Sequence, residues 1–394
     1  MFFQTLDNKS ECVGVFAEGK LHFDDLPTNL TKTWKYAPYL DDKDIEYASL
    51  YCLGKDLADV CPDDLKDDFE KITNELKAFL VSFQESKISL EDNCFFDLVP
   101  ERFLLEYCDI KNKITEHVFE TYSRPANYDF LLSLTKTIDE ISQRRLEINI
   151  RCLDKQLAEV RTRKFIKKLS KNNKRICYNI AGTKTGRLTT TKSSFPILTL
   201  DKKYRGVIVP KNDWLLELDF NAAELRTFLA LSQVKQPDED IHEWNIKNVF
   251  CEDIDRDVAK TKAFAWLYNS KAKNEKLEKV YKRAEIMDKF WDGENVNTVF
   301  NRKMPASRHH ALNYIIQSTS SDLFLRRMVA INDRLRGMNS FISFSIHDSL
   351  VIDLDQNERH ILSELVDIFE NTDLGNFKAN VSVGKNFADM RKIQ

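Results

Sequence analysis

Two aspartates of the sequence stand where a rigid carboxylate could face a cleft. Asp219 ends the apolar run WLLELDF, and Asp348 lies between the apolar halves of SFISFSIHDSLVIDL. Two carboxylates on separate elements can bridge a pair of divalent cations, which stabilise the attacking and the leaving oxygen of an in-line phosphoryl transfer. Each aspartate also has an ordinary explanation, Asp219 as the N-cap of the following helix and Asp348 as a turn residue.

A second group of residues recurs at every fourth position of RDVAKTKAFAWLY. Successive members drift by about 40° around a helix, so all four share one broad face that spans about 18 Å. Two cations lie at one end of this face and two aromatic rings at the other, which is the polarity of a nucleoside triphosphate. The alternative is an amphipathic helix with its rings in the core and its cations in solvent. The residues are Arg256, Lys260, Phe264 and Tyr268.

A third feature is the run RTRKFIKKLSKNNKR at 161–175, which carries eight Lys or Arg side chains and no acid. Such cations repel one another unless phosphates lie nearby, so the run favours nucleic-acid contact over an ordinary solvated surface. The net charge of the chain, −3, argues neither for nor against a nucleic-acid partner.

The elements that must position these groups alternate between strands and helices. WLLELDF predicts a buried strand, AAELRTFLALS the helix after it, and SFISFSIHDSLVIDL a β-hairpin whose turn carries the polar residues. Residues 44–90, 100–170 and 237–300 are expected to be largely helical, and the long polar-faced helices of the second range would suit an arm along a partner. CVGVFAEG and KLHFDDLP predict two strands joined by a turn. The mixture indicates an α+β fold.

Composition excludes several classes of protein. The chain has 394 residues, of which 42% are hydrophobic, so two or three domains are expected. The eight cysteines form no C-x-x-C pair, which argues for reduced thiols and against a zinc site or a disulfide framework. The N-terminus lacks the pattern of a signal peptide and no run of 18 apolar residues exists, so no membrane partner is expected.

Taken together, these stretches resemble the A family of DNA polymerases, the bacterial DNA polymerase I class that includes many phage replicases. DFNAAELR resembles motif A of the family, R-x-x-x-K-x-x-x-F-x-x-x-Y its motif B, and HDS at 347–349 its motif C. From about residue 175 to the C-terminus, further segments follow in the order of the family: TGRLTTTKSSFPILTL, YRGVIVP, DIHEW, LNYIIQSTSSDL and VSVGKNFADM. The resemblance implies addition of dNTPs to a primer end by two-metal nucleotidyl transfer, in replication or repair.

The resemblance also implies a right-hand polymerase fold. Its expected parts are a small N-terminal domain at 1–95, a helical thumb at 96–175, a palm with an antiparallel sheet at 176–235 and 301–394, and helical fingers at 236–300. Residues 1–95 are too short for the proofreading exonuclease of the family and show no D-x-E followed by the other carboxylates, so no proofreading is expected. IEYASLYCLGKD at 45–56 faintly resembles the end of an exonuclease, which would make this domain a vestige.

Roles follow for the matching positions. Two Mg²⁺ ions, replaceable by Mn²⁺, would be held by Asp219, Asp348 and the carbonyl of Phe220. The dNTP would be bound by Arg256, Lys260, Phe264, Tyr268, Glu224, His242 and Arg205. Lys260 would donate a proton to the leaving pyrophosphate, and Glu224 would be the steric gate against a ribose 2′-hydroxyl. Primer–template DNA would be bound by Arg187, Asn313, Gln317, His347, Arg163, Lys164, Lys167 and Lys168.

The sequence departs from the pattern of the family at four positions. Motif C normally ends in Glu and here ends in Ser349, and motif A often has Gln where this chain has Ala222. Ala265 and Asn269 replace glycines of motif B. Both metal-binding aspartates are retained, so activity is still expected, with consequences for rate and metal preference.

Three alternatives remain open at this stage. A single-subunit RNA polymerase shares the palm and a His-Asp-Ser motif C, although Glu224 and Phe264 argue against it. A catalytically inactive DNA-binding homologue is disfavoured by the retained aspartates and cations, and reverse transcriptase activity cannot be read from the sequence. A bacterial or phage-infected cytoplasm, at the nucleoid, is the expected location, with a separate exonuclease or processivity factor as a candidate partner.

Overall fold

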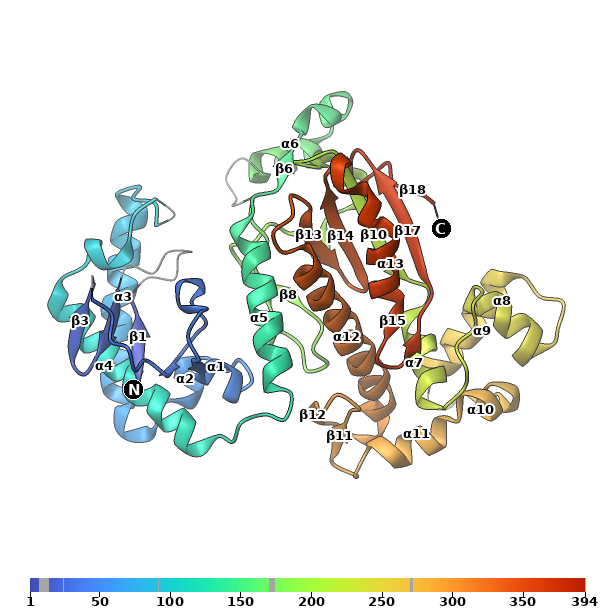
Figure 1. Ribbon diagram of the computed structural model, residues 1–394, viewed down its shortest axis with the longest axis horizontal. Helices are drawn as coiled ribbons and strands as arrows, with labels where there is room; N and C mark the ends of the chain where they lie inside the picture. Colours follow the sequence, from blue (N-terminus) through green and yellow to red (C-terminus); the bar gives the residue numbers. More distant parts are fainter. Residues whose placement is uncertain (7–13, 24, 91, 170–173, 270–271, 394) are drawn as a thin grey trace. The chain divides into compact units, whose positions relative to one another are not determined.

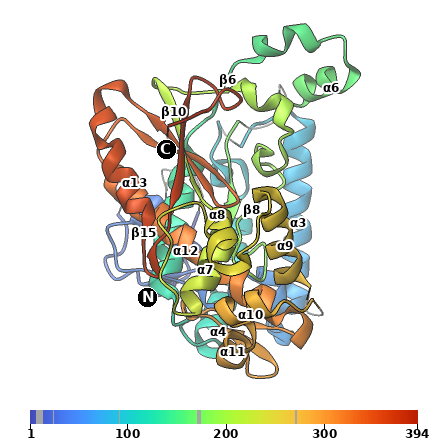
Figure 2. The same ribbon diagram turned by 90° about the vertical axis from the view of Figure 1, so that its right-hand side faces the viewer.

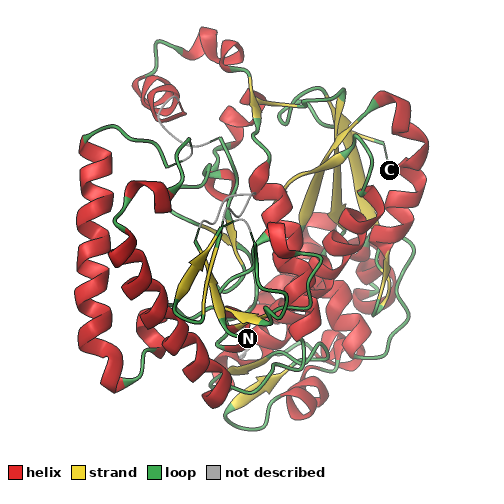
Figure 3. Cartoon of the chain, turned by 60° about the vertical axis from the view of Figure 1, so that its left-hand side comes forward, coloured by secondary structure: helices red, strands yellow, loops and turns green. Residues whose placement is uncertain are grey.

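A computed structural model describes the chain except for residues 7–13, 24, 91, 170–173, 270–271 and 394. Helices predominate over strands, and the strands gather into small sheets (Figure 3). The chain forms two compact units, Met1–Lys136 and Thr137–Gln394. No helix in the described ranges is both long enough and apolar enough to cross a membrane.

The first unit is built on short strands and two long helices. β1 (Phe3–Thr5), β2 (Val15–Ala17) and β3 (Lys20–His22) form an antiparallel sheet, which confirms the two predicted strands joined by a turn. β4 (Lys32–Thr33) and β5 (Glu46–Tyr47) pair in parallel. The helices are α1 (Ala48–Tyr51), α2 (Leu57–Val60), α3 (Lys66–Glu85) and α4 (Glu101–Thr121). Most of the helix within the predicted stretch 44–90 is therefore α3, which is preceded by short helical pieces.

The second unit contains the main sheet, whose strand order is β13-β14-β10-β17-β18 and whose pairs are all antiparallel. The strands are β10 (Trp214–Phe220), β13 (Phe341–Ile346), β14 (Ser349–Leu354), β17 (Ala379–Gly384) and β18 (Arg391–Lys392). The predicted strand WLLELDF and the predicted hairpin are both confirmed. Along β10, Leu216, Leu218 and Phe220 share one buried face, and Glu217 and Asp219 alternate onto the other face together with Leu215.

Two helices cover one face of this sheet. They are α12 (Arg308–Leu335), which contacts β13, and α13 (Leu362–Glu370), which contacts β10 and β17; Figure 1 shows both in front of the sheet. The ring of Phe220 stacks on Phe369, with 4.2 Å between centroids, and meets Phe377 edge-on. Because side chains alternate along a strand, this packing turns Asp219 toward the opposite, polar face of the sheet.

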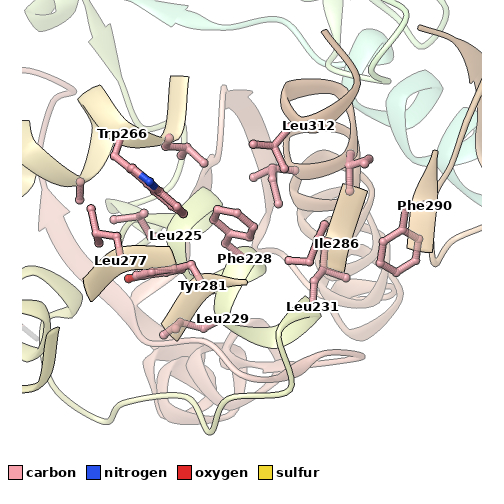
Figure 4. Packing of buried hydrophobic residues seen from close by; sticks show 14 of the residues in the cluster. Leu225, Phe228, Leu229, Leu231, Trp266, Leu277, Tyr281, Ile286, Phe290 and Leu312 are labelled. Atoms are coloured by element: carbon pink, nitrogen blue, oxygen red, sulfur yellow. The ribbon is translucent and has the colours of Figure 1, made fainter. Parts of the chain in front are cut away.

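The predicted helical range 237–300 is largely helical. After α7 (Ala223–Leu231) come α8 (Ile241–Asn245), a π-helical turn (Ile246–Phe250), α9 (Arg256–Tyr268), α10 (Glu275–Tyr281) and α11 (Arg283–Phe290), followed by the hairpin of β11 (Asn295–Asn297) and β12 (Lys303–Pro305). Their shared core is centred on Phe228, Trp266 and Tyr281, whose rings contact one another (Figure 4). A continuous apolar core thus joins α7 to α9.

The expected long helical arm within 100–170 is wrong in its second half. α5 (Tyr128–Gln143) ends, and the chain enters β6 (Glu147–Ile148), which pairs with β9 (Ile208–Val209). Apolar residues in LEINI alternate, which fits a strand rather than a helix. A 3₁₀ stretch (Ile150–Gln156) and α6 (Val160–Leu169) follow, and α6 projects from the sheet near β6 (Figure 2).

Candidate active site

Cross-strand pairing brings the two predicted metal-binding aspartates together. In the register of β10 and β14, Asp219 pairs with Ser349, which directly follows Asp348 at the hairpin tip. His347, the other tip residue, has φ +54°, a left-handed conformation that lets two residues turn the chain. The N-cap of α7 is Ala222, with no side-chain cap, so the explanation of Asp219 as a helix cap is wrong.

Both carboxyl groups lie in surroundings that disfavour negative charge. The pKa of Asp219 is raised to about 6, mainly by burial and in smaller part by Glu217 and Asp348, while a 3.4 Å hydrogen bond from Asn380 opposes the shift. Burial also raises the pKa of Asp348, against the opposing charges of Arg187 and His347. Adjacent desolvated carboxyl groups favour a bound cation, which would restore their ionised form.

The helix α9 presents the four predicted residues on its exposed face. Arg256, Lys260 and Tyr268 are exposed and Phe264 is partly buried. The opposite face, with Ala259, Ala263, Trp266 and Leu267, belongs to the apolar core. The alternative that both rings lie in the core is therefore wrong for Tyr268, whereas Phe264 does pack against the edge of the core. Small alanines let α9 approach that core closely, and the rings of Phe264 and Tyr268 stack nearly parallel, 5.9 Å apart.

Arg256 is held by Asp240. Its guanidinium donates to the two carboxylate oxygens of Asp240 at 3.3 and 2.7 Å. Asp240 caps the N-terminus of α8 and accepts a further 2.8 Å hydrogen bond from the amide of Asn221. The surrounding donors outweigh the effect of burial, so the pKa of Asp240 lies well below its usual range. Lys260, one turn further along α9, makes no hydrogen bond or ion pair through its ammonium group in the described part of the chain.

His242 lies beside this pair and is buried. Burial lowers the pKa of the imidazole to about 4; Asp240 opposes this shift, while Arg256 and Lys260 add to it. The ring is therefore neutral at pH 7, and its Nδ1 has no hydrogen-bond partner among the described residues. It contacts Phe264, with 6.0 Å between ring centroids. His242 thus lies beside the face of α9 that carries Arg256, Lys260 and Phe264, and their role in binding dNTP stays a prediction.

Glu224 is hydrogen-bonded to Arg187 and Tyr268, and Arg187 lies beside Asp348. Arg187 donates to one of its oxygens at 2.8 Å, and the hydroxyl of Tyr268 donates to the other. The same guanidinium lies 3.8 Å from Asp348. Burial raises the pKa of Glu224, with Arg187 opposing. Arg187, predicted to contact DNA, therefore lies between the steric-gate position and a predicted metal ligand.

Two further residues predicted to contact the duplex, Asn313 and Gln317, lie on α12. Asn313 and Gln317 are one turn apart on α12 and so share a face. The hydroxyl of Thr185 donates to Gln317 at 2.9 Å, which ties the loop of Arg187 to α12. Gly186 has φ +80°, and a side chain there would meet Arg302 at 2.6 Å, so only glycine fits. Arg302 is itself fixed by a two-bond pair with Asp322.

Other predicted residues lie apart from this group. Arg205 packs over the ring of Phe387, and no contact among the described residues joins it to the cations of α9. Arg163 caps the chain before α6 by donating to the carbonyls of Leu157 and Ala158. The other predicted cations of α6 are exposed: Lys164, Lys167 and Lys168. Their role as duplex contacts stays a prediction.

Four residues of the site were missed by sequence reasoning. Asn221 and Asp240 lay within quoted motifs, and an aspartate ahead of a helix is a recognisable cap signal. Glu217 stands two residues before Asp219, so the period of a strand places both on one face. Asn380 carried no signal because only the pairing of β10 with β17 brings it beside Asp219.

The donor set suits hard cations. Asp219 and Asp348 offer carboxylate oxygens, and Mg²⁺ needs only one or two of these because water and phosphate oxygens complete its shell. Within the described ranges, no cluster of three or more His, Cys, Asp or Glu side chains has the geometry of a metal site. The arrangement therefore fits an ion shared with a substrate rather than a closed structural site.

Comparison with known proteins identifies the fold but no family. No protein-family model matches the sequence, and no curated protein matches it. Among solved structures, the chain is similar to the POL domain of Pol1 from M. smegmatis, described as a complex with DNA primer-template and dNTP. The TM-score is 0.66, the identity is 12%, and the match covers 99% of this chain and 96% of that chain. The chain thus has the fold of a DNA polymerase domain along its whole length.

Proposed function

We propose that this protein is a DNA polymerase of the A-family type, which adds dNTPs to a primer by two-metal nucleotidyl transfer. The observation that carries the proposal is the convergence on one site of Asp219, Asp348 and the exposed cation–aromatic face of α9. The fold shared with a polymerase domain supports it. In these terms, the sheet of β10 and β14 is the palm, α8 to α11 are the fingers, and α6 belongs to the thumb.

The residues divide the work of the reaction. Asp219 and Asp348 would hold two Mg²⁺ ions, with the Phe220 carbonyl as a further ligand; such ions would supply activation of the primer hydroxyl and neutralisation of phosphate charge. Arg256 exchanges Asp240 for triphosphate oxygens, and the neutral His242 donates a hydrogen bond to them. Lys260, whose ammonium group bonds to none of the described residues, binds the phosphates and donates a proton to pyrophosphate.

Selection of the sugar falls to Glu224. Its side chain is fixed by Arg187 and Tyr268 rather than free to swing, so it can exclude a 2′-hydroxyl by bulk. Phe264 packs on the sugar, and Tyr268 lies toward the templating base. Preference for deoxynucleotides separates this proposal from the RNA-polymerase alternative.

Primer extension tests the proposal. Purified protein with Mg²⁺ and a primed DNA template should incorporate dNTPs much faster than rNTPs. Asp219→Ala and Asp348→Ala should each abolish extension, while DNA binding, measured by fluorescence anisotropy, remains within severalfold of the unaltered protein. A mismatched primer end should not be removed, because no proofreading is expected of this chain. Preferred incorporation of rNTPs, or extension by either alanine variant, would refute the proposal.

A further inference from the structure

The main-sheet strands place a carboxylate beside the position where motif C lacks one. The hydroxyl of Ser349, which stands where the family pattern has Glu, donates a 2.9 Å hydrogen bond to Oε1 of Glu217. Ser349 is 8% exposed, so its hydroxyl needs a partner within the protein. The bond therefore orients a glutamate that belongs to β10, not to the hairpin.

The register explains why the two residues meet. Asp219 pairs directly with Ser349, and Glu217 pairs with Val351, the residue two positions further along β14. Glu217 and Asp219 lie on the same face of β10, two positions apart. Glu217 is therefore the diagonal neighbour of Ser349 across the ladder, within the reach of a long side chain.

The charge of this glutamate is not neutralised by the protein. Among the described residues, Glu217 makes no ion pair with Lys, Arg or His, and its hydrogen-bonding partner is the uncharged Ser349. Glu217 lies on the face of β10 that carries Asp219, two positions away, so two carboxylates share this face. The bond from Ser349 satisfies a hydroxyl but leaves the charge of Glu217 unbalanced, whereas a bound divalent cation would balance both charges.

We propose that Glu217, oriented by Ser349, is the third carboxylate of the catalytic site, moved from the motif C hairpin to the motif A strand. The inference rests on the proposed polymerase function. Glu217 acts as a positioning residue: it orients water of the metal shell and adds negative charge beside Asp219, without itself being a ligand. Ser349 is then the anchor of a relocated carboxylate rather than a lost catalytic group.

Metal affinity tests this role without relying on catalysis. Mn²⁺ binding is followed by electron paramagnetic resonance, using the full chain with a dideoxy-terminated primer–template and the next dNTP. Glu217→Gln keeps the size and the acceptor for Ser349 but removes the charge. It should weaken Mn²⁺ binding by about 10–100-fold, the usual effect of altering a group that supports metal ligands. Glu294→Gln, an exposed glutamate whose side chain has no described contact, is the charge-matched control and should bind as the unaltered protein does.

A reciprocal exchange gives the sharpest result. Glu217→Ser should weaken Mn²⁺ binding, and adding Ser349→Glu in the same chain should restore it, because a carboxylate and a hydroxyl again face each other across the ladder. Ser349→Ala, which leaves Glu217 in place but unanchored, should cause a smaller loss than Glu217→Gln. If Glu217→Gln misfolds, the loss of Mn²⁺ affinity in Ser349→Ala tests the role of Glu217 instead.

The outcomes separate the two proposals. If the unaltered protein extends primers but Glu217→Gln binds Mn²⁺ within twofold of it, the inference about Glu217 is overturned while the proposed function stands. Failure of the reciprocal double variant to recover affinity also overturns it. If the unaltered protein does not extend primers at any metal concentration, the proposed function fails, and the inference fails with it.

Discussion

Asn221 lies two residues after Asp219 in the chain. Its side-chain amide donates a 2.8 Å hydrogen bond to Asp240. Asp240 in turn holds Arg256 at the start of α9. The carbonyl oxygen of the same Asn221 accepts bonds from Ile241 and from Arg226. A single amide therefore connects the end of the strand that carries Asp219 to the helix that carries Arg256 and Lys260.

Asn221→Ala should raise the KM for dNTP by roughly tenfold, since loss of this amide frees Asp240 and Arg256 from their present geometry at a cost of about 1–3 kcal/mol. DNA affinity should change little. Steady-state extension with varied dNTP and anisotropy with fixed DNA measure the two quantities. Asn248→Ala, which removes an exposed amide bond to the carbonyl of Trp244, is the control. An unchanged KM would show that the network does not reach the substrate.

Glu224→Ala should increase rNTP incorporation relative to dNTP by about 10–100-fold, because the bulk that excludes a 2′-hydroxyl is removed. Competition between the two nucleotides in single-turnover extension gives the ratio. Tyr268→Phe is the matched control: it removes the hydroxyl bonded to Glu224 but keeps the ring and the bulk of the gate. Equal relaxation in both variants would mean that Glu224 acts through its bond to Tyr268 and not through its size.

Lys111→Met should stabilise the protein near neutral pH. Lys111 is 9% exposed, and burial lowers its pKa to about 8, a shift that Cys108 partly opposes and Lys35 reinforces. In the unfolded chain the pKa of this lysine is about 10.4, so between pH 8 and about 10.5 the unfolded state binds more protons than the folded state. The free energy of unfolding therefore rises with pH across this window. The gain from Lys111→Met should be at most about 3 kcal/mol at pH 7.

Urea unfolding at pH 7 and pH 9.5 checks this prediction, since the gap between the variant and the unaltered protein should narrow by about 2 kcal/mol at the higher pH. Lys113→Met, at an exposed lysine paired with Asp109, should show no such narrowing. A pH-independent gap would mean that Lys111 keeps its ordinary proton affinity in the fold.

Arg302→Ala should destabilise the second unit by about 3–5 kcal/mol, because it leaves the carboxylate of Asp322, which is 0% exposed, without its ion-pair partner. Arg302→Met with Asp322→Leu should recover most of the loss, since neither buried charge then remains. Chemical denaturation of the three proteins measures both effects. A double variant as unstable as the single one would show that the pair contributes through geometry, by supporting Gly186 and the loop of Arg187.

Replacing Lys164 and Lys168 of α6 by alanine should weaken DNA binding and reduce the slope of log affinity against log salt by about two, one for each lost phosphate contact. Anisotropy titrations between 50 and 200 mM salt give the slope. Lys279→Ala with Lys289→Ala removes two exposed cations from α10 and α11 and is the control. If the slope of log affinity against log salt stays at the value of the unaltered protein, α6 does not contact the duplex.

Local sequence patterns predicted the strands and helices of the site but not the hydrogen bonds that connect them. Apolar runs with polar ends predicted β10 and the hairpin, and four-residue spacing predicted the exposed face of α9, because strand and helix periods are local properties. The bonds of Asn221 to Asp240 and of Ser349 to Glu217 arise from register and loop packing, which single-sequence patterns do not encode. The break after α5 was missed because β6 finds its partner β9 some sixty residues away.

The hydroxyl of Tyr268 and the guanidinium of Arg256 each already hold a carboxylate of the protein itself. Under the proposed function, a nucleotide would not fill a void here, because its phosphates would compete with Asp240 for Arg256. The affinity for a nucleotide would then be the difference between the bonds it forms and the bonds it breaks. A wrong nucleotide that forms only some of the new bonds would dissociate as the resting contacts form again. The resting structure is in this sense the first competitor that every substrate meets.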